Sequence, residues 1–138
     1  MSTSLVEQGF AICDQSDGFC QHIGPFYQRQ RNNHFERALV IDKRHLNPEG
    51  VVNGGVVLSL MDYVIYRAIG DVISHQVKFA TINLNSNFLA AAKLGELLIG
   101  TGIITRKTSS VIFAEGVISS PERKVMNASG IWKVISQN

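Results

Sequence analysis

A pair of glycines and an acid are spaced along one predicted helix in the middle of the chain. Asn53 is a good helix N-cap, and Gly54 and Gly55 follow it directly. Their backbone amides would lie at the positive end of the helix with no side chain to block approach, so they could stabilise a developing negative charge. Asp62, about two turns further along, could act as a general base or as a nucleophile. The sequence does not choose between these two roles.

The helix that carries these residues is predicted from its apolar spacing. Asp62 lies on a narrow flank together with Gly55, Ser59 and Tyr66. A carboxylate beside the apolar side is costly to desolvate, so we expect it to be paired or used in chemistry; the alternative is that it simply faces solvent. The helix is predicted to end near Gly70 and is too short to span a bilayer. The apolar side comprises Val56, Val57, Leu60, Met61, Val64, Ile65 and Ala68.

Before the helix, the chain predicts short and irregular elements. Residues 4–11 suit a short helix or a hydrophobic lid, and 13–24 suit an irregular loop. Residues 25–31 and 35–42 suit an antiparallel pair of strands joined by a tight turn. A loop over 45–52 then leads into the helix.

After the helix the apolar period changes to two, which predicts an antiparallel meander. Glycines inside strands weaken a sheet unless another backbone must come close, and the central helix is the obvious neighbour for those at 100, 102, 116 and 130. We therefore predict an α+β fold in which a curved antiparallel β-sheet wraps around one long central helix. The four predicted strands are 77–89, 97–107, 111–119 and 125–135.

Length and composition restrict the class of protein. The 138 residues fit one domain, 1–138, with an N-terminal helix and loop segment over 1–24. A net charge of +2 without a dense basic run gives no argument for nucleic acid, and no segment suggests a membrane partner. Cys13 and Cys20 lack metal-type spacing to the histidines, so we expect no metal and a reduced, cytoplasmic protein. The N-terminus does not have the pattern of a signal peptide.

The stretch His45–Asp62, HLNPEGVVNGGVVLSLMD, resembles the H-x-N-x-x-G-x-x-H-G-G-x(6)-D signature of the PaaI-like (phenylacetyl-CoA-type) acyl-CoA thioesterases. The resemblance implies the hotdog fold and hydrolysis of an acyl-CoA thioester to a free acid and CoA, with no cofactor beyond the coenzyme A of the substrate. One position departs from the signature, because Asn53 stands where the family usually has histidine. Segments at 22–27, 81–85 and 93–96 also resemble this family, so the resemblance covers about residues 18–135.

The resemblance also implies roles for individual residues. Asp62 would be the base or nucleophile, and Gly54 and Gly55 the oxyanion hole. Asn47 would help to hold the thioester carbonyl, and Thr81 would orient the attacking water. Substrate-binding candidates are His45, Asn53, Ser59, Tyr66, Phe79 and Phe88, and the cations for the CoA phosphates are Arg106, Lys107, Arg123 and Lys124. The alternatives are core packing for the aromatic residues, solvated surface for the cations and an ordinary turn for the asparagine.

The spacing of the proposed catalytic groups bears on the assembly. Gly54 and Asp62 are eight residues apart, or about 12 Å along a helix, whereas both must come within about 3 Å of one carbonyl. Two antiparallel copies of the helix related by a two-fold axis would bring Asp62 of one subunit beside Gly54 of the other. We therefore predict an obligate homodimer with composite active sites, which the family often doubles to a tetramer.

Two other functions remain open at this point. A hotdog hydratase or dehydratase would need a histidine and an acid at the substrate, and His45 with Asp62 is the only combination available. A non-catalytic binder of acyl-CoA or another small ligand is the second, because Asn53 replaces an imidazole. The identity of the acyl group is not readable from the sequence.

Overall fold

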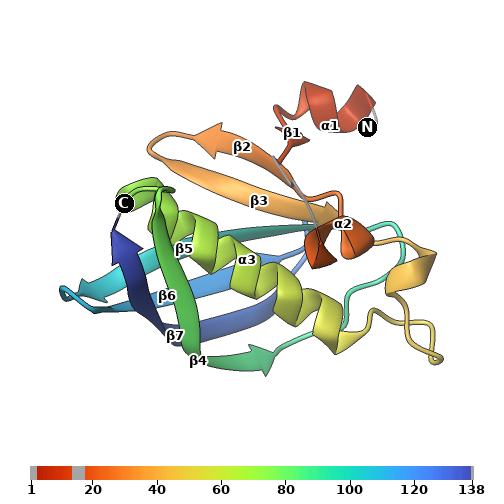
Figure 1. The fold of residues 1–138 in the computed structure, drawn as a ribbon. Helices are drawn as coiled ribbons and strands as arrows, with labels where there is room; N and C mark the ends of the chain where they lie inside the picture. The colour runs from red at the N-terminus through yellow and green to blue at the C-terminus, as the bar shows by residue number, and fades with distance from the viewer. Residues whose placement is uncertain (1–2, 14–17, 138) are drawn as a thin grey trace.

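A seven-stranded antiparallel sheet curves around one long helix in the computed structural model, which describes residues 3–13 and 18–137 (Figure 1). This arrangement confirms the predicted α+β hotdog fold. The strand order in the sheet is β1-β2-β3-β5-β6-β7-β4. The helices are α1 (Thr3–Glu7), α2 (Phe19–Ile23), the 3-10 turn η1 (Lys43–His45) and α3 (Gly54–Val72). The strands are β1 (Ala11–Ile12), β2 (Tyr27–Arg31), β3 (His34–Val40), β4 (Val77–Phe88), β5 (Leu97–Lys107), β6 (Val111–Ser119) and β7 (Lys124–Gln137).

Helix α3 begins where the sequence predicts and ends two residues later than expected. The Asn53 side chain accepts a hydrogen bond from the Gly55 N–H at 2.7 Å, which confirms the predicted N-cap. The apolar side of α3 faces the sheet, and each large side chain buried there contributes about 1.5–3 kcal/mol relative to an exposed one. No helix in the described part of the chain is long and apolar enough to cross a bilayer. The buried side chains of α3 are Val57, Leu60, Met61, Val64, Ile65 and Ile69.

Glycines in the sheet make room for α3, as predicted. A Cβ atom at Gly100 would lie 2.8 Å from Val64 Cγ2, and one at Gly116 would lie 2.7 Å from Met61 Sδ. The prediction is wrong for Gly130, where an added Cβ would meet the Trp132 ring and the backbone of β4 instead of the helix. At this position the sheet itself requires the space.

The strand boundaries after α3 agree with the sequence, but the predicted meander is correct only for β5, β6 and β7. Strand β4 pairs with β7 and not with β5, so it forms one edge of the sheet. The loop 89–96 carries the chain back across the end of the sheet: the Leu89 N–H bonds to Val125 O, and the Gly95 N–H to Ile41 O. A two-residue period identifies a strand but not its neighbours, which explains the error.

The N-terminal segment lies on the other face of the sheet. Leu5 and Phe10 pack against Tyr27 and Ala38 in a second, smaller core. Alternate residues of a strand point to opposite faces, and Leu39 faces α3, so this second core lies away from the helix. The expected short helix is therefore α1, and it is not a lid over Asp62. The loop predicted for 13–24 is wrong at 19–23, which form α2, and its residues 14–17 lie outside the described residues.

A buried ion pair fixes the C-terminal end of α3 to β3. Arg37 is 1% exposed, and its two terminal nitrogens donate to the Asp71 carboxylate at 2.6 and 2.9 Å. Burial raises the pKa of Asp71, but the hydrogen bonds and charge of Arg37 lower it more, so the pKa lies below its ordinary value. His75 Nε2 also lies 2.9 Å from this carboxylate. The pair is a structural feature of this end of the helix.

Candidate active site

Asp62 and Thr81 meet on the side of α3 that faces β4. The Thr81 hydroxyl donates to Asp62 Oδ1 at 2.9 Å, although 19 residues separate the two in the chain. A β-bulge at Ile82 shifts the register between β4 and β7 next to Thr81. Bulges redirect side chains, and this one lets Thr81 and then Leu84 face the helix. The structure thus brings together the predicted acid and the predicted water-orienting hydroxyl.

These two residues lie in a groove of about 730 Å³ that we call the Asp62 groove. Three elements form its walls: the start of α2, the middle of α3, and β4. Tyr66 and Phe79 contact each other edge to face there, with ring centroids 5.7 Å apart. Five residues predicted for the site therefore share one groove, namely Ser59, Asp62, Tyr66, Phe79 and Thr81. Ser59 donates its hydroxyl to Gly55 O at 2.7 Å.

The first glycine of the pair lies at a separate depression of about 260 Å³. Gly54 lines it, next to the ring of Phe88 on β4. The Gly55 N–H is engaged by Asn53, whereas the Gly54 N–H makes no hydrogen bond to any described residue. Within one protomer, the amides of the glycine pair and the Asp62 carboxylate are therefore not presented to a common space.

The loop before α3 is held by His45 and Asn47, the two remaining residues of the signature that were predicted for the site. His45 is buried; its Nδ1 accepts from the Asp42 N–H at 2.9 Å, and its Nε2 lies 2.6 Å from Ile23 O. These partners assign the proton to Nε2. The Asn47 side-chain oxygen accepts from the N–H groups of Glu49 and of residue 51, at 2.9 and 3.3 Å. Both side chains organise the loop, and neither lines the Asp62 groove.

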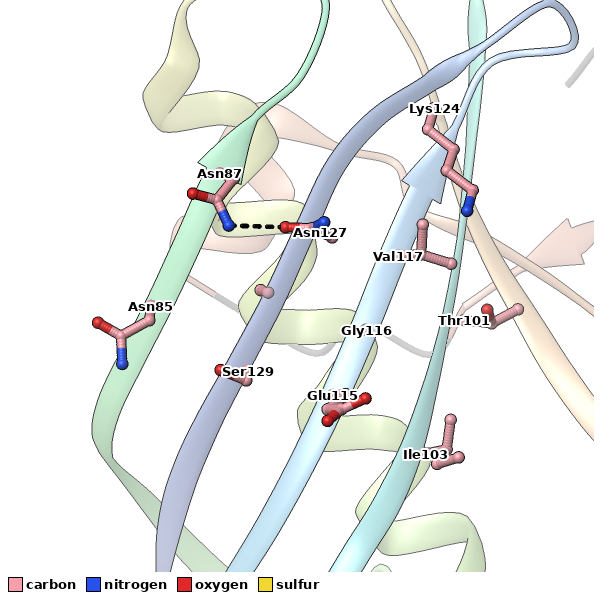
Figure 2. Close-up of a pocket in the computed structure, with 11 residues that line it drawn as sticks. Asn85, Asn87, Thr101, Ile103, Glu115, Gly116, Val117, Lys124, Asn127 and Ser129 are labelled. Carbon is pink, nitrogen blue, oxygen red and sulfur yellow. Dashed lines mark hydrogen bonds between the residues drawn. The ribbon is translucent and has the colours of Figure 1, made fainter.

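The predicted cations lie away from the Asp62 groove of the same protomer. Arg106 and Lys107 are exposed at the end of β5, where Arg106 borders a different depression. Arg123 is engaged, because it donates to both carboxylate oxygens of Glu96 at 2.8 and 3.1 Å. Lys124 lies at a polar depression of about 430 Å³ on the outer face of the sheet, where the Asn87 side chain donates to Asn127 (Figure 2).

Sequence reasoning missed six residues that line the Asp62 groove, namely Phe19, Cys20, Leu58, Tyr63, Arg67 and Leu84. Arg67 Nε is buried and has no hydrogen-bond partner among the residues that the structure describes, whereas the buried Tyr63 hydroxyl lies beside the Cys13 thiol. Burial raises the pKa of Tyr63 well above its ordinary value, so the hydroxyl keeps its proton. One feature of the sequence could have identified Arg67: it is a charged residue near the C-terminal end of the predicted helix, where most of the neighbouring residues are apolar.

Comparison with known proteins identifies the class to which this fold and site belong. A family model described as the thioesterase superfamily matches residues 49–127, which include α3 and most of the sheet. The chain belongs to the thioesterase superfamily. It is a PaaI-like hotdog thioesterase, an enzyme that hydrolyses thioesters, as its sequence predicted.

Individual relatives agree with this assignment. A Pseudomonas aeruginosa protein named as an esterase is 28% identical over 128 residues, which cover 92% of this chain and 96% of the relative. A thioesterase of Ralstonia eutropha JMP134, named as related to phenylacetic acid degradation, is 26% identical with a TM-score of 0.74, over 83% of this chain and 88% of that one. A thioesterase of Streptococcus pneumoniae TIGR4, solved with coenzyme A, shares the fold at 24% identity and a TM-score of 0.71, over 82% of this chain and 90% of that one.

Proposed function

We propose that this protein hydrolyses an acyl-CoA thioester to a free acid and CoA, in a site that two protomers build together. The observation that carries the proposal is the contact between Thr81 and Asp62 inside a groove large enough for an acyl group. The coenzyme A bound to the Streptococcus pneumoniae relative supports CoA as the leaving thiol.

The chemistry follows from the groups in the groove. Thr81 donates to Asp62 Oδ1, which leaves Asp62 Oδ2 to take a proton from water or to attack the thioester carbon itself. The Thr81 oxygen can still accept a hydrogen bond and can thereby hold a water beside the carboxylate. In the general-base route, water oxygen bonds to the carbonyl carbon, the carbon–sulfur bond breaks, and the departing CoA sulfur receives the proton that Asp62 removed.

The developing oxyanion needs donors on the other side of the carbonyl, and the Gly54 N–H suits this role. It has no partner among the described residues and lies at the positive end of α3. The amide of the same chain is about 12 Å from Asp62 along the helix axis. The donor is therefore assigned to the partner protomer.

The edge of the sheet supports a second copy of the chain. Strand β4 has 12 residues and no neighbour on its outer side in the described sheet. Ile82 and Phe88 on this strand are 56% and 58% exposed. A long apolar edge strand readily pairs with another chain. Antiparallel pairing of two β4 strands about a two-fold axis would set two α3 helices side by side and produce two equivalent sites.

Release of thiol from a panel of acyl-CoA thioesters tests the proposal. Asp62→Asn should lower kcat/KM by about 10²- to 10⁴-fold, because the variant lacks the base. Glu115→Gln is the matched control, since it exchanges an exposed acid for an amide on the outer face of the sheet. Sedimentation should give a dimer or a dimer of dimers. Hydrolysis that is indifferent to Asp62, or full activity in a monomer, would contradict the proposal.

The hydratase alternative receives no support from the geometry. It requires His45 beside Asp62, but both nitrogens of the His45 ring contact backbone groups of the neighbouring loops. A ring in this position has no free nitrogen for a substrate unless the loop is rearranged.

A further inference from the structure

Arg67 is a cation in the wall of the Asp62 groove that has no counter-ion in the described part of the chain. It lies on α3 five residues after Asp62, so its backbone is about 7.5 Å further along the helix axis. Its Nε is buried without a hydrogen-bond partner. A buried polar group that lacks a partner is costly, and the cost is larger for a charged one.

The other buried or partly buried arginines of this protein do not share this property. Arg29 lies 2.7 Å from a Glu36 carboxylate oxygen, and Arg37 lies 2.6 Å from one of Asp71. Arg123 is likewise paired with Glu96 at 2.8 Å. The fold thus supplies an acid wherever an arginine is structural. Arg67 differs in lining a groove, so a ligand there can bind the terminal nitrogens of its guanidinium and supply the counter-charge.

We propose that the acyl group taken by this enzyme ends in a carboxylate and that Arg67 binds that carboxylate. This inference rests on the proposed function, because it places the thioester carbonyl at Asp62 and the far end of the acyl group at Arg67. The planar guanidinium matches a carboxylate with two parallel hydrogen bonds.

The spacing and the walls restrict the length of the acyl group. The two carboxyl carbons of a four- to six-carbon diacid are three to five bonds apart, or at most about 4.5–7.5 Å with bonds of about 1.5 Å, which is within the backbone offset of about 7.5 Å between Asp62 and Arg67. Phe79 and Leu84 of β4 offer apolar contacts for the methylene groups between the two ends. The substrate class is therefore a short dicarboxylic acid of about four to six carbons, joined to CoA through one of its carboxyl groups.

Glutaryl-CoA and valeryl-CoA test the inference, because their five-carbon acyl groups differ only in a terminal carboxylate or methyl group. Wild type should prefer glutaryl-CoA in kcat/KM by at least about 10-fold. Arg67→Met should lower kcat/KM for glutaryl-CoA by about 10- to 100-fold, the scale of hydrogen bonds to a charged group, and should leave valeryl-CoA within about 3-fold. Arg67→Lys should retain part of the preference for glutaryl-CoA, since lysine keeps the positive charge but cannot make two parallel hydrogen bonds to the carboxylate.

A wild-type preference for valeryl-CoA, or an equal loss on both thioesters in Arg67→Met, would overturn the inference. Arg31→Met is the control, because that side chain is 54% exposed on β2. Thermal unfolding checks that each variant is folded. If wild type hydrolyses no acyl-CoA of the panel, the proposed function fails, and titration calorimetry then measures the dissociation constants of glutaryl-CoA and valeryl-CoA. A lower Kd for glutaryl-CoA that Arg67→Met abolishes supports the carboxylate site, and equal Kd values exclude it.

Discussion

A composite active site can be tested by mixing two inactive variants, one that lacks the acid and one that lacks the amide. Asp62→Asn removes the acid. Gly54→Pro removes one backbone N–H at the first helical position, where proline is well tolerated. Asn53 has φ −64° and ψ 128°, the extended region that a residue before proline adopts, so the loop need not change. Each variant should retain at most about 1% of the activity, since loss of one oxyanion donor costs about 10²- to 10³-fold.

The expected recovery follows from counting sites. When equal amounts of the two variants exchange subunits, about half of the dimers contain one chain of each kind. If Asp62 of one chain works with Gly54 of the other, each mixed dimer has one site with neither substitution and one site with both. About a quarter of all sites are then intact, so the mixture should reach about 25% of wild-type activity. If each site lay within one chain, the mixture would give only the mean of the two variants.

The assay is thiol release from an acyl-CoA after subunit exchange, with a different affinity tag on each variant. Co-purification on both tags shows that mixed dimers have formed. Gly54→Ala is the matched control for the proline variant, because it keeps the amide and adds a Cβ 3.0 Å from the exposed ring of Phe88, which can move aside. Mixed dimers that are formed in the expected amount and remain inactive would refute the composite site.

Three further predictions concern stability. Asp71→Asn leaves buried Arg37 unpaired and should lower the free energy of unfolding by about 3 kcal/mol, or the melting temperature by about 10 °C. The folded pKa of Asp71 is below its unfolded value, so this contribution is present above about pH 4 and is lost as the pH falls through the folded pKa. Urea unfolding of wild type and Asp71→Asn should therefore give free energies of unfolding whose difference shrinks in acid. A difference that stays constant with pH would contradict this prediction. Gly100→Ala should cost about 1–3 kcal/mol by pushing on Val64, and less in a Val64→Ala background. Asn53→Ala should cost about 1 kcal/mol in the same assay, whereas Asn53→Ser, which can still cap, should cost almost nothing.

The helix and the strands were predictable because local chemistry determines them. The capping side chain of Asn53 and the apolar spacing after it specify where α3 begins and which side it buries. The glycines at 100 and 116 predicted close approach of the helix because strands tolerate glycine poorly otherwise. The neighbour of β4 was not predictable in this way. Pairing of β4 with β7 depends on the path of the 89–96 loop, and no periodicity records that path.

The site was predictable in part. Asp62 was identified because an acid beside an apolar stripe needs a partner, but its partner Thr81 is on a distant strand, and only the family resemblance indicated it. Arg67 was missed because a charge on the flank of an amphipathic helix is usually solvated, and only the fold shows that α2 and β4 enclose this flank. The bulge at Ile82 has no clear sequence signal, yet it determines which residues of β4 face the groove.

The asparagine that replaces the signature histidine changes what the helix end offers to an oxyanion. Its side chain occupies the Gly55 N–H at 2.7 Å, which leaves the Gly54 N–H as the available donor. Displacing the cap costs about 1 kcal/mol, whereas a hydrogen bond to a charged oxygen contributes about 1.5–3 kcal/mol. The exchange is therefore favourable for the negatively charged transition state but not for the neutral carbonyl of the bound substrate. A donor released only as charge develops stabilises the transition state more than the substrate, and this difference is what accelerates a reaction. In the proposed site, Asn53 is thus compatible with turnover, and the Gly55 amide is a candidate for a second oxyanion donor.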